Sequence, residues 1–279
     1  MSIRNISDFI TELKKIPGPH KTELFFRGHS DVGFELKPSI YRSEKLISNE
    51  IIIFKEFILR TPIDFLNEKS ALEKLVKMQH YGLPTRLLDI TSNPLVALYF
   101  ACSGNEKEDG RVIVFRIPNS HIKYYDSDTV SILANIAKRP ISFNIKGIKN
   151  LDIETFNKEN EIKYLLHEIK EEKAYFQPII DPKDIEQVVA VKVKQSNNRI
   201  IKQSGAFLIF GINEEKSVCA SIPEKWIVEF TSKKEKIDFT IDKDSKNSIL
   251  KELDTLGINE SILFPELDNQ ARYLKNKYG

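Results

Sequence analysis

Residues 78–101, MQHYGLPTRLLDITSNPLVALYFA, constrain the fold more than any other stretch, because polar side chains interrupt an otherwise apolar run. Gly82 and Pro84 are expected to end the preceding helix, since glycine adopts the left-handed cap conformation and proline cannot continue a helix. The residues at 83–89 are predicted to form a strand. A buried helix at 94–102, with a proline in its first turn, follows it. The stretch therefore predicts a helix, a strand and a second helix joined by short polar turns.

The rest of the chain predicts an α+β fold with a mixed or antiparallel sheet and flanking helices. Further helices are predicted at 7–16, 43–60 and 64–80, near 128–138 and 152–173, and twice within 244–279. Further strands are predicted at 22–26, 110–118, 186–193, 205–211, 225–230 and 237–241. No internal repeat or low-complexity linker divides this order, so one domain over 1–279 is favoured. Residues 119–185 are less regular, and a helical insertion or separate lobe there stays an alternative.

Composition excludes several functional classes. The formal charge is +2, from 42 basic and 40 acidic residues, which gives no global sign of nucleic-acid or membrane binding. Cys102 and Cys219 lie far apart without a CxxC spacing, which disfavours a disulfide scaffold and fits a reducing compartment. The N-terminus lacks a signal-peptide apolar region, and no run approaches the ~18 apolar residues of a membrane span. We therefore expect a cytoplasmic protein that has no membrane partner.

Familiar catalytic and cofactor motifs are absent. The sequence contains no phosphate-binding GxxxxGK[ST], no GxGxxG after a strand, no HExxH and no GxSxG. The five histidines have no i,i+4 spacing, so no metal site is expected.

The first candidate site residues follow the strand at 22–26. The Arg27 guanidinium can meet a phosphate or carboxylate bidentately, and Gly28 allows backbone or ligand to come close. The structural alternative is an ion pair between Arg27 and Asp89 that joins two strands. LKPSIYR adds Tyr41 and Arg42, and a second arginine near the first would suit an anionic ligand. The alternative for this segment is a surface turn that leads into a helix.

The opening stretch supplies most of the other candidates. Each has a structural alternative. His80 can interact favourably with the negative C-terminal end of its helix dipole. Thr91 can cap the next helix, and Asp89 can accept hydrogen bonds from the amides at its start. Each residue alone is more often structural than catalytic, but together they surround a strand-to-helix turn, where ligands commonly bind. Gln203 lies two residues before Gly205 and an apolar strand. It can bond a sugar hydroxyl or an amide, or can be a turn residue.

Several motifs together resemble the FRG-domain family, which is named for a Phe-Arg-Gly found here at 26–28. They are FFRG, LKPSIYR, QHYGLPTRLLDITSNPLVALYFAC, RIIKQSGAFLIFG and LGINESILFPELD, and they span about residues 20–270. A weaker resemblance is to arginine-type ADP-ribosyltransferases. The similar features are the order of Arg27, then Thr85 leading into ALYFA, then VIVFRIP, then Gln203 before AFLIFG.

The second resemblance implies an ADP-ribosyltransferase-like fold with NAD as co-substrate and no metal. The residues it implies for cofactor binding are Arg27, Gly28, Tyr41, Arg42, Tyr81, Thr85, Arg86, Thr91, Tyr99 and Phe100. Those it implies for catalysis are Arg27, Asp89, Gln203 and His80. One departure matters, because Gly205 stands where the transferase motif has its catalytic glutamate. A carboxylate stabilises positive charge on the ribose as nicotinamide leaves. Either Asp89 or another acid (Glu214, Glu215) takes that role, or Gln203 only positions substrate, or the chain is not catalytic.

Three functions remain to be separated. The resemblance implies a transferase that modifies RNA, DNA or protein, as a toxin or antiphage defence effector with a neutralising antitoxin. The alternative is a non-catalytic module that binds a nucleotide or a phosphorylated ligand. A nuclease or other hydrolase using Asp89 and His80 is least favoured, because no carboxylate cluster for a metal is visible near them. The Lys-rich segments 192–202 and 233–236 can contact phosphate backbones, although solvated strand edges explain each of them better.

Overall fold

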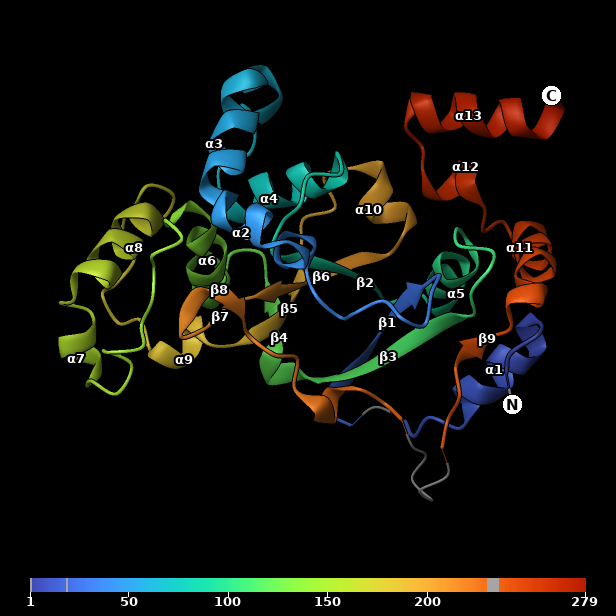
Figure 1. The fold of residues 1–279 in the computed structure, drawn as a ribbon, viewed down its shortest axis with the longest axis horizontal. Coiled ribbons are helices and arrows are strands. Elements are labelled where there is room, and N and C mark those ends of the chain that lie inside the picture. Colours follow the sequence, from blue (N-terminus) through green and yellow to red (C-terminus); the bar gives the residue numbers. More distant parts are fainter. Residues whose placement is uncertain (1, 19, 230–235) are drawn as a thin grey trace.

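The computed structural model describes residues 2–18, 20–229 and 236–279, and a seven-stranded mixed sheet forms its centre (Figure 1). The strand order is β4-β5-β6-β2-β1-β3-β9, in which β4 and β5 are parallel and the other neighbours are antiparallel. The strands are β1 (Thr22–His29), β2 (Leu87–Thr91), β3 (Gly110–Pro118), β4 (Ile122–Tyr124), β5 (Val188–Lys192), β6 (Gly205–Phe210) and β9 (Thr240–Ile241). A separate hairpin consists of β7 (Ile212–Asn213) and β8 (Glu215–Cys219). The α+β fold with a mixed sheet is therefore confirmed.

In the view of Figure 1 the helices lie above this sheet and at both of its ends, with α6 to α9 at the left end and α1 and α11 at the right end. The α-helices are α1 (Ile6–Lys14), α2 (Glu44–Ser48), α3 (Glu50–Arg60), α4 (Ala71–His80), α5 (Pro94–Cys102), α6 (Asp128–Asn135), α7 (Ile153–Phe156), α8 (Asn160–Lys170), α9 (Pro182–Ile185), α10 (Asn198–Lys202), α11 (Lys246–Thr255), α12 (Glu260–Leu263) and α13 (Leu267–Tyr278). The short 3-10 helices are η1 (Ser39–Arg42), η2 (Pro62–Phe65), η3 (Asn119–His121), η4 (Ile136–Lys138), η5 (Glu224–Trp226) and η6 (Lys243–Ser245). Among the helices of the described ranges, none combines the length and apolar character needed to cross a bilayer.

Several predicted strands differ in extent from the observed ones. The strand predicted at 83–89 begins only at Leu87 and continues to Thr91 as β2. The segment predicted as a strand at 225–230 instead enters η5 and then makes one isolated bridge between Ile227 and Phe115, while residue 230 lies outside the described ranges. The 3-10 turn of η5 buries the Trp226 side chain completely, and beyond it the Val228 amide donates to the Val114 carbonyl at 2.9 Å. Of the strand predicted at 237–241, only the last two residues form a strand, β9, although the Phe239 carbonyl also accepts from the Val112 amide at 3.0 Å.

Several predicted helices are interrupted or begin at other residues. The helix predicted at 43–60 is divided into α2 and α3 at Asn49, and the one at 152–173 is divided into α7 and α8. The helix predicted from 64 begins only at α4, where Ser70 and Glu73 form a reciprocal capping box. Asn5, rather than Ser7, caps α1. Asn93 caps α5 by accepting a hydrogen bond from the Leu95 amide at 3.0 Å.

Two hydrophobic clusters cover one face of the sheet. One packs α4, α6 and α8 onto β2, β5 and β6, and the other packs α1, α5 and α11 onto β1 and β3. Helices α6 to α9 from the 119–185 region contribute Leu133, Leu165 and Ile185 to the first cluster, so they share a core with the central sheet. The opposite face holds a third cluster that includes Phe115 and Trp226. Helices α4 and α5 therefore lie on the same face of the sheet, α4 against β2 and α5 against β1.

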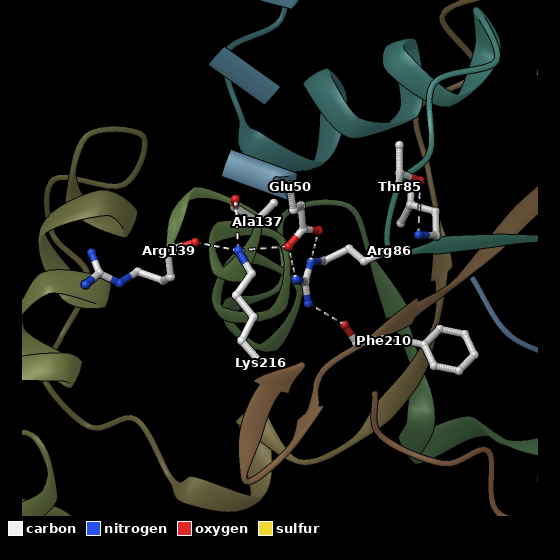
Figure 2. Close-up of polar contacts among 8 residues, drawn as sticks. Glu50, Thr85, Arg86, Ala137, Arg139, Phe210 and Lys216 are labelled. Atoms are coloured by element: carbon white, nitrogen blue, oxygen red, sulfur yellow. Dashed lines mark hydrogen bonds and ion pairs between the residues drawn. The ribbon is translucent and has the colours of Figure 1, made fainter. Parts of the chain in front are cut away.

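A buried ion cluster of Glu50, Arg86 and Lys216 lies beneath α3 (Figure 2). Arg86 donates from Nε and Nη2 to the two Glu50 oxygens at 3.0 and 2.5 Å, and from Nη1 to the Phe210 carbonyl at 3.0 Å. Lys216 Nζ lies 2.9 Å from Glu50 Oε2 and donates to the Arg139 carbonyl. Burial favours the neutral acid, but the charges of Arg86 and Lys216 hold the pKa of Glu50 below its usual value. The cluster thus joins α3, β8 and the residue directly before β2 through one carboxylate.

We expect Glu50→Gln to lower the free energy of unfolding by about 3–5 kcal/mol, because it leaves two buried cations without their counterion. Urea denaturation at neutral pH measures this loss. Glu56→Gln on the same helix is the matched control, since Glu56 pairs with Arg60 while 46% exposed and should contribute less than about 1 kcal/mol. Equal losses in the two variants would show that the buried cluster does not stabilise the fold in this way.

Candidate functional site

The site begins where β1 and β2 diverge. Within the described residues these strands pair at one position, Phe26 with Thr91. Along a strand, the backbone N–H and C=O groups of successive residues point to alternate sides. The Arg86 carbonyl and the Ser92 amide both bond on the β6 side, so residues an odd number of positions away from them point to the opposite side. The carbonyl of Asp89 consequently points toward β1, where no strand backbone is close enough to pair with it.

The Arg27 guanidinium fills this gap. Its Nη1 donates to the Asp89 carbonyl oxygen at 2.7 Å and lies 3.8 Å from Asp89 Oδ2, and its Nε donates to His29 Nε2 at 3.0 Å. The side chain remains 16% exposed. Arg27 therefore joins the two strands, as the structural alternative predicted, and also presents a partly exposed cation.

His29 fixes the orientation of Arg27 and was not among the predicted site residues. Because its Nε2 accepts a hydrogen bond, the proton of the neutral ring lies on Nδ1. Burial first, and then the charges of Arg27 and Arg42, lower the pKa of His29 to about 4. The i,i+2 spacing in FRGH was the available signal, since alternate strand residues share a face.

Asp89 is held from the helix side by Gln79, a second residue missed in the sequence. Gln79 Nε2 donates to Asp89 Oδ2 at 2.8 Å, and Gln79 Oε1 accepts from the Thr85 hydroxyl. The Asp89 side chain is 62% exposed. Thr85 thus orients the Gln79 side-chain amide, and that amide orients the Asp89 carboxylate, which remains exposed to solvent.

Arg27, Gln79 and Asp89 line a cavity of about 190 Å³ between α4, α5, α10 and the strands β1, β2 and β6. The predicted site residues that line it are Arg27, Gly28, His80, Asp89, Thr91, Phe100 and Gln203. Lining residues that were not predicted include Gln79, Asn197, Arg199 and Phe207. Asp89 is the one carboxylate among the lining residues. Glu214 and Glu215, the other acids considered for the missing glutamate, lie in the β7–β8 hairpin and its turn. Gly28 also has a packing role, since a Cβ there would lie 2.0 Å from the Ala97 carbonyl oxygen on α5.

Other predicted residues lie outside the cavity. Tyr41, Thr85, Arg86 and Tyr99 are buried, and Arg86 is fully committed to the ion cluster of Figure 2. Thr85 influences the cavity only through Gln79. Tyr81 is exposed just after α4.

Arg42 also lies outside the cavity, exposed at the end of η1. Its charge nevertheless lowers the pKa values of Arg27 and His29. Arg42 therefore adds positive charge near Arg27 from outside the cavity, at the end of a turn that leads into α2.

The segment around α12 packs against the α10 side of the cavity (Figure 1). Gln203 Nε2 donates to the Leu263 carbonyl at 3.0 Å, and Arg199 lies 4.7 Å over the Phe264 ring. The Phe264 ring also meets Phe100 edge-on, with centroids 6.0 Å apart. The side chain predicted to bond substrate, Gln203, is thus partly used to bind the C-terminal segment.

His80 has a polar partner in the same segment. Its Nε2 lies 3.3 Å from Glu266 Oε1. Burial and the charge of Arg199 lower the pKa of His80, and Glu266 opposes them only in part. The imidazole is therefore neutral at physiological pH. Within the described part of the chain, no three His, Cys, Asp or Glu side chains come together in a way that could hold a metal ion.

Comparison with known proteins identifies part of the chain. Residues 22–110, from β1 to the first residue of β3, match the family model of the FRG domain. Arg27, His29, Gln79 and Asp89 all lie within the matched residues, whereas Gln203 lies beyond them. No curated protein and no solved structure matches the chain.

The pKa of His29 predicts a pH dependence of stability. The unfolded ring has a pKa near 6.5 and the folded ring near 4, so the unfolded state binds more protons between these values. The contribution of His29 is complete above pH 6.5 and is lost as the pH falls toward 4, by up to about 3 kcal/mol. We expect His29→Gln, whose amide can still accept from Arg27, to show a smaller loss of unfolding free energy over this window. Identical pH profiles for the two proteins would contradict this assignment.

Proposed function

We propose that the protein binds NAD at this cavity and transfers ADP-ribose to a macromolecular acceptor. The supporting observation is Arg27, a cation oriented by His29 and the Asp89 carbonyl at the wall of a partly apolar cavity. Such an arrangement suits a ligand with phosphates at one end and a ring at the other. The activity fits the toxin or antiphage effector that the transferase resemblance implies, with a neutralising antitoxin as partner.

The size of the cavity indicates which part of NAD it can enclose. About 190 Å³ is less than the ~300–1,000 Å³ of typical ligand pockets, so it suits only one end of the dinucleotide. We place the nicotinamide end against the Phe100 and Phe207 side chains. The diphosphate then lies toward Arg27 and Arg42, whose combined charge attracts it.

The proposed reaction breaks the bond between ribose C1′ and the nicotinamide nitrogen. The electron pair leaves with nicotinamide, and the acceptor nucleophile forms the new bond to C1′ and loses a proton. Asp89 stabilises the positive charge that develops on the ribose, since it is the carboxylate that lines the cavity. His80 accepts the proton, because a neutral imidazole has one basic nitrogen.

One observation favours the alternative of a non-catalytic nucleotide-binding module. Gly205 occupies the place of the transferase glutamate, and the remaining carboxylate of Asp89 is already bonded to Gln79. Release of nicotinamide from NAD separates the two functions. Stable NAD together with measurable nucleotide binding would establish the module and exclude the enzyme.

Arg27→Lys should weaken NAD binding by roughly 10- to 100-fold, because an ammonium cannot reproduce charge-assisted bonds from a planar fork. Titration calorimetry with NAD measures this change. Circular dichroism should show a folded variant, and Arg60→Ala on the exposed end of α3 should bind as the wild type does. Unchanged affinity in Arg27→Lys, or the same loss in Arg60→Ala, would remove Arg27 from the phosphate site.

Asp89→Asn should lower nicotinamide release by roughly 10²-fold while leaving NAD affinity nearly unchanged, because the amide lacks the negative charge needed only as the bond breaks. The amide can still bond Gln79, so the fold should be retained. Release rates at saturating NAD test this expectation. Full turnover by the variant would assign the charge-stabilising role to another residue.

A further inference from the structure

A second groove adjoins the cavity along α4. Its volume is about 440 Å³, and it shares Val76, His80 and Asn197 with the cavity. A molecule bound in the groove could therefore place a reactive group beside His80, where the groove meets the cavity. The groove has no part in the binding of NAD described above.

The charges of the groove are balanced. Lys77 Nζ lies 3.0 Å from Glu68 Oε1, and Lys194 Nζ lies 2.8 Å from Glu73 Oε1. All four side chains line the groove, so each cation already has a carboxylate partner there. Nucleic acids are bound chiefly by cations that neutralise successive phosphates, and their backbone would face both of these carboxylates. This surface therefore disfavours RNA and DNA.

The remaining groups suit a polypeptide. Tyr81, which is 62% exposed, and Tyr125 line the groove, and Lys194 Nζ lies 4.7 Å over the Tyr125 ring. The side chain of Asn67 can donate to and accept from a peptide backbone, and Asn197 can donate to one, since its Oδ1 already accepts from the Ile200 amide at 2.8 Å. Tyrosine combined with neutral hydrogen-bonding groups is typical of surfaces that bind proteins.

We propose that this groove binds a polypeptide segment of the acceptor, so that the protein ADP-ribosylates proteins rather than nucleic acids. The inference rests on the transfer function proposed above. A nucleophilic side chain of the bound segment reaches ribose C1′ past His80, which takes its proton, while nicotinamide leaves with the electron pair of the broken bond.

Labelled NAD and a cell lysate test the acceptor class. After incubation with the purified protein, the products are digested with either protease or nuclease. We expect the label in large products to be lost on protease treatment and to resist nuclease. Nuclease-sensitive label would overturn the protein acceptor and leave the transferase standing. Absence of both label and free nicotinamide would overturn the transferase and, with it, this inference.

Tyr81→Ala tests the groove itself. We expect the ratio of labelled acceptor to released nicotinamide to fall about fivefold, as for an aromatic residue central to an interface. Tyr175→Ala is the matched control, because Tyr175 is 94% exposed and lies outside the groove, and its ratio should equal that of the wild type. An unchanged ratio in Tyr81→Ala, or an equal fall in the control, would overturn the assignment of the groove.

Discussion

The hydrogen bond from Arg27 to the carbonyl of Asp89 is the contact on which the rest of the site depends. Two adjacent strands that diverge would normally leave a backbone carbonyl without a partner, which is unfavourable away from water. A guanidinium can bridge that gap because it is long and carries several donors in one plane. The cavity opens at the same divergence. Arg27 therefore both pairs with the Asp89 carbonyl and lines the cavity.

Two arginines in similar sequence settings thus have different roles. Arg86 and Arg27 each join β2 to another segment, but Arg86 is fully enclosed and its donors are directed to Glu50 and the Phe210 carbonyl. Arg27 has a neutral histidine and a backbone oxygen as its nearest partners, and the Asp89 carboxylate is further away. Its charge is therefore less compensated at short range than that of Arg86. This difference makes Arg27 the better ligand for an anion.

The sequence predicted the class of fold and most of its strands, because alternation and apolar runs report directly on burial in a sheet. It also predicted that Arg27 and Asp89 lie together. Gln79 was missed because its role depends on the packing of α4, which leaves no pattern in the chain. His29 was missed although its spacing places it on the same strand face as Arg27, because the spacing does not show that its ring accepts a hydrogen bond from Arg27. Tyr99 was placed in the site although it lies in the core, because an apolar helix shows which residues are buried but not which neighbour each one faces.

The C-terminal segment has a consequence for the synthesis of the protein. The Gln203 and Arg199 side chains are held by Leu263 and Phe264, which follow β1 by more than two hundred residues. A growing chain can pair β1 with β2 long before these residues have left the ribosome. The cavity then lacks the support on its α10 side. The complete cavity can therefore form only after the C-terminal segment has been synthesised.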